Sequence, residues 1–284
     1  MKTIITKKLL IYCVFSFVTI TFSFAQNWVS TSPQNKKVVL EEFTGIKCSY
    51  CPDGHKRANE LKAANEGNVF LVNIHSGGYA TPGAGEPDMR TPEGDIIDNA
   101  SGLTGYPAGS VNWAKDPRAE NRDKWSASAN SILSQSSPVN AYVKAYFDRE
   151  TRELTTEVEL YYTANGSADN KLTVMLTQDN ILGPQTGGTR FNPDNYVGGN
   201  YIHNHVLRDV ITEGAWGETI TETNEGDYTY KKYVTVLPEI IKNIPLKFNY
   251  LNVVAFVSES DNNNILTGHE AKVDFDRTGA LDLS

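Results

Sequence analysis

The sequence predicts an α/β domain followed by an all-β domain, and the second is expected to be an antiparallel β-sandwich. Two observations predict this order. Between residues 38 and 75, two short apolar runs flank a segment with helical spacing, which is typical of a strand–helix–strand unit. After residue 138, apolar residues recur at every second position in several short runs separated by turn residues, which is typical of an antiparallel β-sandwich.

Residues 1–25 have the pattern of a secretory signal peptide. Lysines precede an apolar run that starts at Leu9 and ends in Ser23-Phe24-Ala25, a small–X–small cleavage pattern. We expect export to the periplasm or outer membrane and a mature chain that begins at Gln26. Cys13 lies in the apolar run, without a lipobox, and would leave with it. The remaining chain has no apolar run of about 20 residues, so we expect no transmembrane helix after signal removal.

The chain is acidic, with 34 Asp and Glu against 26 Lys and Arg and a formal net charge of -8. The signal peptide contains lysines and no acid, so the mature chain is more acidic still. Such a chain repels phosphate backbones, and it has no basic stripe with interleaved aromatic residues. These features exclude nucleic acid as a partner.

The two cysteines of the mature chain lie in Cys48-Ser49-Tyr50-Cys51, where the first predicted strand gives way to a helix. A helix N-terminus stabilises a thiolate and lowers a cysteine pKa from about 8.5 into a range of roughly 3.5 to 7.5. Cys48 is therefore the candidate nucleophile and Cys51 the resolving thiol. As a structural element the pair would contribute little, because closing so short a loop stabilises a fold by roughly 2 kcal/mol.

This stretch resembles the active-site strand, motif and helix of the thioredoxin superfamily. Glu42, six residues before the first cysteine, matches the buried acid beneath the motif. Gly105-Tyr106-Pro107 matches the turn with a cis-proline that opens the next strand. The resemblance implies that Glu42 transfers a proton to and from the resolving cysteine. It also implies that Tyr106 and Pro107, with Tyr50 of the motif, contact a substrate polypeptide.

The other elements of the first domain follow in order. Pro52 is tolerated in the first turn of the helix after Cys51, and Gly67 ends that helix. The next segments are expected as a strand over 69–75, a loop over 76–92, a helix over 94–100, a strand over 108–113 and a closing helix over 116–135. The loop follows the carboxyl end of a parallel strand, so it either faces the substrate or is a surface loop without function. Residues 114–121 are too short for the extra strand of thioredoxins, which predicts a truncated sheet edge.

The linker at 134–138 divides the mature chain into a thioredoxin-like domain over 26–137 and a β-sandwich domain over 138–284. Alternation predicts strands over 139–147, 154–162, 172–176, 228–237, 251–257 and 266–273. The long segment 183–217 is rich in glycine and aromatic residues, which favours a functional excursion over a disordered one. It is a candidate site for a glycan or an envelope protein.

The exported thioredoxin-like half, the β half and the segment from Tyr201 to Arg208 together resemble the outer membrane protein twenty-eight (Omp28-related) family of Gram-negative envelopes. The resemblance covers nearly the whole mature chain. It implies an envelope protein associated with the outer membrane.

Two groups of residues could instead bind a metal ion. Cys48, Cys51 and His55 share a helical spacing, and with His75 they would form a soft-ligand set for copper or zinc. His203 and His205 share a strand face if that segment is extended. If no metal binds, His55 would be an exposed residue of the helix, and His203 and His205 would have surface or packing roles. We expect no metal and no cofactor.

Two functions follow from these patterns. The first is a thiol–disulfide oxidoreductase or isomerase that acts on protein thiols or disulfides in the envelope, with the β domain presenting or tethering it. The second is a binding or structural envelope protein that uses the redox fold as a scaffold. A metal carrier is a third reading. The sequence does not quantify a reduction potential, so the redox direction stays open.

Overall fold

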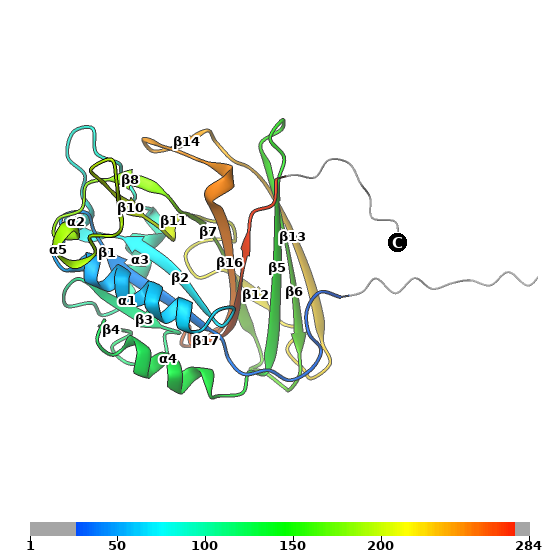
Figure 1. The fold of residues 1–284 in the computed structure, drawn as a ribbon. Helices are drawn as coiled ribbons and strands as arrows, with labels where there is room; N and C mark the ends of the chain where they lie inside the picture. Colours follow the sequence, from blue (N-terminus) through cyan, green and yellow to red (C-terminus); the bar gives the residue numbers. More distant parts are fainter. Residues whose placement is uncertain (1–26, 276–284) are drawn as a thin grey trace, which may run out of the picture.

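Residues 27–275 are described by a computed structural model of the chain (Figure 1). The predicted signal peptide, with Cys13 and the cleavage site before Gln26, lies outside these residues. Within them, no helix combines the length and the apolar character needed to cross a membrane.

A nine-stranded sheet joins strands from both predicted domains. Its order is β17-β16-β7-β11-β2-β1-β3-β4, and β12 also pairs with β7. The first part of the chain contributes β1 (Val38–Thr44), β2 (Val69–His75), β3 (Ala108–Val111) and β4 (Ala119–Asn121). The second part contributes β7 (Asn170–Gln178), β11 (Val206–Val210), β12 (Glu218–Ile220), β16 (Leu251–Glu259) and β17 (Ile265–Lys272).

The two parts meet between β2 and β11, which run parallel with Val206 opposite Asn73. The Asn73 side chain donates to the carbonyl of Asn204 at 2.9 Å, and its backbone N–H donates to the carbonyl of His205 at 2.7 Å. One sheet therefore crosses the predicted boundary at residue 137. The boundary itself stays a prediction, but the sheet does not favour independent folding of the two ranges.

The strand–helix–strand prediction is confirmed. Helix α1 (Cys51–Ala64) connects the parallel strands β1 and β2, and every residue of both strands is buried. The helix begins with Pro52 in its first turn and turns Ala58 and Leu61 toward the sheet. Figure 1 shows α1 and α4 (Trp125–Leu133) along the same side of the sheet.

The opposite face of β1 and β2 is covered mainly by the second part of the chain. Val39, Phe43 and Phe70 share one buried cluster with Val254 and Phe256 of β16. Helix α3 (Pro92–Ala100) adds Ile97 to it. The core of the first half is thus completed by residues far along the chain.

Three predictions for the first half are wrong in detail. The sheet edge is not truncated, because β4 pairs antiparallel with β3, with Ala119 opposite Ser110. Three residues are enough for this strand, so the closing helix begins at Trp125 rather than near Asp116. The loop over 76–92 also contains a single helical turn, α2 (Gly77–Ala80).

A second layer consists of the antiparallel strands β13, β6 and β5, in that order. They span β5 (Val139–Phe147), β6 (Glu153–Tyr162) and β13 (Tyr228–Val236), which confirms the predicted hairpin. Their inner side chains share a core cluster with those of β7, β16 and β17. The α/β, sheet-rich architecture is confirmed, whereas the separate β-sandwich stays a prediction because five strands of the second part extend the first sheet.

The small elements lie mostly within the glycine-rich and aromatic-rich excursion. A three-stranded sheet is formed by β8 (Ile181–Gly183), β10 (Asn200–His203) and β9 (Tyr196–Val197), and α5 (Gly188–Phe191) follows β8. Further on come the hairpin β14 (Ile240–Ile241) and β15 (Ile244–Pro245) and the 3-10 turn η1 (Phe248–Tyr250). Figure 1 shows α5 and β10 beside the start of α1.

Candidate functional site

Cys48 and Cys51 are joined by a disulfide where β1 passes into α1. Cys51 is the first residue of the helix and is 0% exposed. Cys48 is 3% exposed, so the candidate nucleophile is buried in the disulfide-bonded state. The reason lies in a segment of the second half that covers it.

Glu42 and Pro107 both lie against the first turn of α1. A β-carbon at Gly54 would overlap the Glu42 carboxyl group and would fall 3.0 Å from Cβ of Pro107, so only glycine leaves room for both. The Tyr106–Pro107 peptide bond is cis, as predicted. The structure thus brings together the acid, the proline and the cysteine-bearing helix turn.

The Glu42 carboxyl is fully buried, and neither of its oxygens has a hydrogen-bond partner among residues 27–275. Burial raises the pKa of Glu42 well above its ordinary value, while the charge of Arg122 opposes this rise and that of Asp53 adds to it. Burial therefore favours the protonated form of the carboxyl in this disulfide-bonded state.

Arg122 is a neighbour of the site that the sequence did not reveal. Its guanidinium donates to the Asp53 carboxylate and lies 5.8 Å from the ring centroid of Tyr50. Burial pulls the pKa of Asp53 upward, but hydrogen bonds from Arg122 and Arg57 outweigh this effect and lower the pKa. Arg122 follows β4, the strand we did not expect, so no local pattern placed it here.

Residues 183–191, which we call the covering segment, close the outer side of the disulfide. The side-chain amide of Gln185 donates to the carbonyls of Gly45 and Cys48 at 3.2 and 3.1 Å. The N–H of Thr186 donates to the carbonyl of Ile46 at 2.8 Å. The ring of Phe191 lies 5.2 Å from that of Tyr50. The predicted excursion over 183–217 thus begins as a cover on the cysteine motif.

A buried histidine cluster lies next to the carboxyl of Glu42. His55 is buried rather than exposed on the helix, so that structural expectation is wrong. Its Nε2 lies 2.8 Å from Thr44 Oγ1, and its Nδ1 lies 2.9 Å from the hydroxyl of Tyr201. The rings of His75 and His203 are 5.5 Å apart. The spacing of Cys51, His55 and Ala58 along the helix was a signal that could have revealed this burial.

The histidines of this cluster are neutral at pH 7. Burial lowers the pKa of His55 to about 3 and that of His203 to about 4, and it holds the pKa of His75 well below its ordinary value. Within the described chain, no three His, Cys, Asp or Glu side chains are arranged to hold a metal ion. His205 points elsewhere, with its Nε2 3.2 Å from Oδ1 of Asn59.

Of the predicted substrate-binding residues, Tyr50 is exposed, Tyr106 is half-buried and Pro107 is buried. Tyr50 is 53% exposed and Tyr79, from the 76–92 loop, is 51% exposed. The ring of Tyr79 meets that of Tyr106 edge-on at 5.7 Å, and the Tyr106 hydroxyl donates to Asp98 at 2.8 Å. Tyr79 and Tyr106, with Lys47 and Gly78, border a shallow pocket of about 460 Å³. The loop therefore lies beside the site, and its contact with a substrate stays a prediction.

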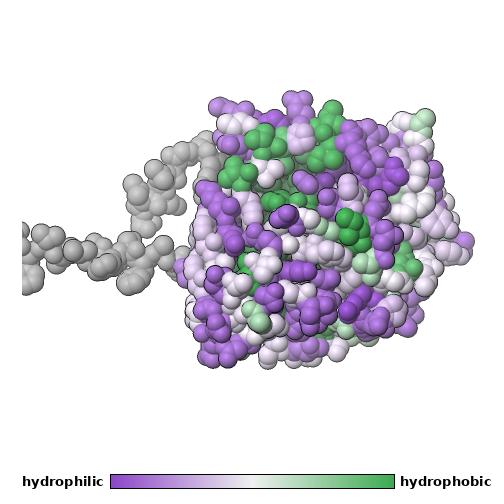
Figure 2. Space-filling model, turned by 180° about the vertical axis from the view of Figure 1, so that it is seen from behind, coloured by the Kyte–Doolittle hydropathy of each residue, from purple (hydrophilic) through white to green (hydrophobic). Residues whose placement is uncertain are grey.

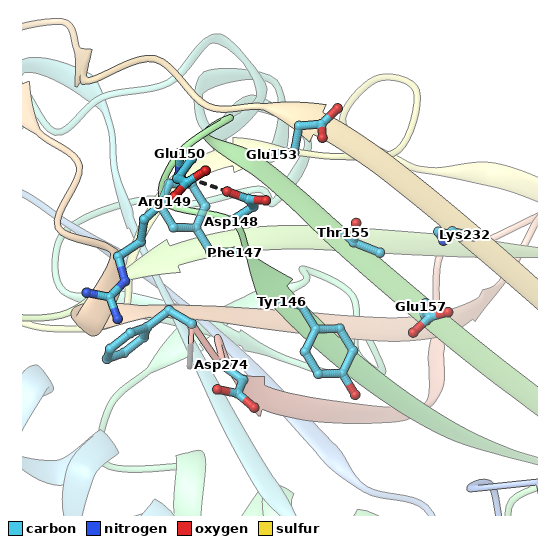
Figure 3. A pocket seen from close by; sticks show the side chains of 11 residues that line it. Tyr146, Phe147, Asp148, Arg149, Glu150, Glu153, Thr155, Glu157, Lys232 and Asp274 are labelled. Atoms are coloured by element: carbon cyan, nitrogen blue, oxygen red, sulfur yellow. Dashed lines mark hydrogen bonds between the residues drawn. The ribbon is translucent and has the colours of Figure 1, made fainter. Parts of the chain in front are cut away.

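A larger pocket of about 610 Å³ lies elsewhere, at one end of β5 and β6 (Figure 3). Its walls carry the carboxylates of Asp148, Glu150, Glu153, Glu157 and Asp274. Asp148 accepts a hydrogen bond from the N–H of Glu150 at 2.7 Å, so part of this acidity serves the local turn. The pocket contains neither cysteine nor histidine, and we assign it no chemistry.

The family model described as outer membrane protein Omp28 matches residues 95–277. No curated protein matches the chain. Among solved structures, HBP35 of Porphyromonas gingivalis is similar at 19% identity and a TM-score of 0.66, over 88% of this chain and 80% of that one. A domain of the outer membrane lipoprotein Omp28 from the same organism aligns at 15% identity and a TM-score of 0.34, over 49% of this chain and 90% of that one. The likeness to HBP35 extends across both halves of the fold.

Proposed function

Because the chain belongs to the Omp28 family of outer membrane proteins, we propose that it is an envelope protein that carries out thiol–disulfide exchange at Cys48 and Cys51. The predicted location, in the envelope and associated with the outer membrane, agrees with this family. We propose the redox role of the two cysteines. We also propose that the first half is thioredoxin-like and that a sandwich-like β half presents it.

One observation carries the redox proposal. The disulfide lies at a helix N-terminus, with a buried acid and a cis-proline packed against the same helix turn. A disulfide that closes so short a loop contributes little stability, so exchange chemistry accounts better for the arrangement. Glu42 lies in β1 and Pro107 directly precedes β3, and both are needed to build the arrangement.

In the proposed cycle, the Cys48 thiolate attacks one sulfur of a protein disulfide, and the substrate S–S bond breaks. A mixed disulfide forms, and one substrate thiolate leaves. The Cys51 thiol then gives its proton to Glu42 and attacks the Cys48 sulfur, which releases the second substrate sulfur. The reverse sequence introduces disulfides, and the reduction potential decides between the two directions. Tyr50, Tyr106 and Pro107 would contact the substrate polypeptide.

The covering segment must move for this cycle to run, because an attacking sulfur needs a straight approach to the Cys48 sulfur. Three hydrogen bonds and one aromatic pair, formed by Gln185, Thr186 and Phe191, join the segment to the residues around the cysteine motif. Contacts of this kind open locally at a small fraction of the global unfolding free energy. We infer a closed resting state that a substrate opens.

Reduction of a protein disulfide such as that of insulin tests the proposal. The mature protein should accelerate the reaction, and Cys48→Ser should abolish the acceleration. Cys51→Ser should accumulate a mixed disulfide with the substrate, because the first attack proceeds and the second does not. If the wild-type protein is no faster than Cys48→Ser, and Cys51→Ser traps no partner, the redox proposal fails.

An exposed apolar surface favours a second function, the binding of an envelope partner. The outward face of β13 exposes Tyr228, Tyr230, Val234 and Val236, and Ile240 of β14 is exposed as well. Figure 2 shows hydrophobic side chains gathered along the upper part of one face of the molecule. Val234→Thr with Val236→Thr should weaken retention in the membrane fraction and leave thiol exchange unchanged. If the double variant is retained like wild type, the surface does not serve this function.

A further inference from the structure

The buried carboxyl of Glu42 has one polar neighbour that could serve it without a large movement. His55 Nε2 lies 3.9 Å from Glu42 Oε1, too far for a hydrogen bond in the disulfide-bonded state. In this state Nε2 instead contacts the hydroxyl of Thr44 at 2.8 Å. A small rotation of the imidazole would bring Nε2 to the carboxyl group.

A chain of hydrogen bonds from the second half sets the tautomer of His55. The side-chain amide of Asn192 donates to the hydroxyl oxygen of Tyr201 at 2.9 Å. The hydroxyl hydrogen of Tyr201 then remains for His55 Nδ1, also at 2.9 Å. Burial raises the pKa of Tyr201 to about 12, so it stays a donor at neutral pH. A neutral imidazole that accepts at Nδ1 carries its proton on Nε2, the nitrogen facing Glu42.

We propose that Tyr201 and His55 form a positioning pair for Glu42, in which the Nε2–H of His55 is held ready to stabilise the Glu42 carboxylate during thiol–disulfide exchange. The proposal rests on the function proposed above and assigns it two further residues. Neither residue touches the substrate. The second half of the chain thereby contributes to proton transfer in the first half.

The step can be written for reduction of the protein by a small thiol. The incoming thiolate attacks the Cys48 sulfur, a mixed disulfide forms there, and the Cys48–Cys51 bond breaks. Cys51 leaves as a thiolate and takes the proton of the Glu42 carboxyl group. Glu42 becomes a carboxylate at a buried position, and His55 Nε2–H turns from Thr44 to donate to it. The negative charge that enters on the thiolate ends on Glu42.

The other charged and titratable groups around the pair do not replace this donor. His203 of β10 and His75 of β2 lie near His55, and His205 of the following turn acts on it through charge alone. Burial lowers the pKa of each of these three histidines. Arg122 and Asp53 act on Glu42 through charge, in opposite directions. Tyr201 and Thr44 complete the surroundings of His55.

The experiment measures two quantities in the full mature protein. The first is the pH profile of disulfide reduction by dithiothreitol, with the rate corrected for the fraction of dithiothreitol that is thiolate. The second is the pKa of Glu42 in the reduced protein, measured by carboxyl ¹³C NMR. His55→Leu should raise the pKa of Glu42 by about one to two units and slow the reduction roughly ten- to hundredfold, because a hydrogen bond to a charged group is lost. His55→Gln keeps an N–H donor and should restore part of both quantities. Tyr201→Phe should shift both in the same direction by a smaller amount.

Tyr162→Phe is the matched control. Tyr162 is as fully buried as Tyr201, and its hydroxyl likewise accepts from an asparagine, Asn170, at 2.8 Å, but it lies in the core of the other layer. It should lose comparable stability without moving the pH profile or the Glu42 pKa. The proposal of a positioning pair fails if the wild type exchanges disulfides but Tyr201→Phe and His55→Leu show the same pH profile and the same Glu42 pKa as Tyr162→Phe. If the wild type itself exchanges none, the proposed function fails instead.

Discussion

Gly187 lies directly against the carbonyl of Ser49, so closely that a β-carbon at position 187 would overlap that oxygen. Gly187 also has a φ of 76°, in the left-handed region that glycine tolerates best. The covering segment therefore reaches the cysteine motif through a position where no side chain fits.

Gly187→Ala should open the cover over the disulfide. The left-handed conformation costs alanine about 1–2 kcal/mol, and the overlap with Ser49 adds to that cost, so the open state should become roughly tenfold more populated. Reduction of the disulfide by dithiothreitol should accelerate in proportion. Gly198→Ala is the control, since Gly198 has a φ of 55° but open space around it. Equal rates in the two variants would show that the cover does not limit access.

Glu41→Gln should change how stability depends on pH. Glu41 is buried in β1 and accepts a hydrogen bond from the indole N–H of Trp113. Burial raises the pKa of Glu41 to about 7, although the Trp113 hydrogen bond lowers it in part. Between the unfolded value near 4.5 and about 7, the native state binds more protons than the unfolded state, so stability declines as pH rises through this window.

Glutamine keeps an acceptor for Trp113 and cannot ionise. Relative to wild type, Glu41→Gln should therefore gain roughly 2–3 kcal/mol at pH 8 and little at pH 4.5, as measured by urea unfolding. The buried histidines titrate in both proteins, so the difference isolates Glu41. Glu60→Gln, at an exposed position of α1, should show no such gain. A constant difference across this pH range would contradict the assignment.

Phe256→Ala should destabilise both halves together. Phe256 belongs to β16 but shares a core cluster with Val39, Phe43 and Phe70 of the first half. Removing a buried phenylalanine ring costs about 3–5 kcal/mol. We expect the unfolding midpoint to move to lower urea concentration in two signals at once. One signal is the fluorescence of Trp125, in α4, and the other is the far-ultraviolet circular dichroism. A Trp125 transition that stays in place while the dichroism shifts would show independent domains.

Asn112→Ala should be more damaging than an ordinary loop substitution. The Asn112 side chain accepts from the N–H of Val39 at 2.7 Å and donates to the carbonyls of Lys37 and Ile265 at 2.9 and 3.1 Å. Alanine would leave these buried backbone groups unpaired, at about 1–3 kcal/mol each. Thermal unfolding should show the loss.

Asn263→Ala provides the reference for this change. Asn112 and Asn263 have similar positive φ values, 54° and 59°, so both substitutions carry the same backbone cost. The side-chain oxygen of Asn263 accepts no hydrogen bond from residues 27–275. Equal losses in the two variants would mean that the bridge made by Asn112 does not contribute.

The local parts of the fold could be predicted because their signals are local. The helical spacing after Cys51, the alternation in β5 and β6, and the match around Pro107 each lie within a short stretch of sequence. The pairing of β2 with β11 could not be predicted in this way. It places Asn73 opposite Val206, and the pattern of apolar residues in the two segments does not indicate this pairing.

In the candidate site, too, the local features could be predicted from the sequence and the long-range contacts could not. Glu42, Cys48 and Cys51 lie within ten residues of one another, so their motif was visible in the sequence. The cover over the disulfide and the contact of His55 with Tyr201 both depend on where the excursion returns in space. Tertiary packing, rather than spacing, decides such contacts.

The covering segment also sets an order of events in the life of the chain. A polypeptide is made from its N-terminus, so Cys48 and Cys51 emerge long before Gln185 and Gly187 exist to cover them. During that interval the two thiols are open to oxidants and to other proteins. Completion of the chain ends the interval, because the last strands finish the sheet and the cover then settles over the sulfurs. The two thiols are thus more accessible before residues 183–191 are in place than in the folded protein.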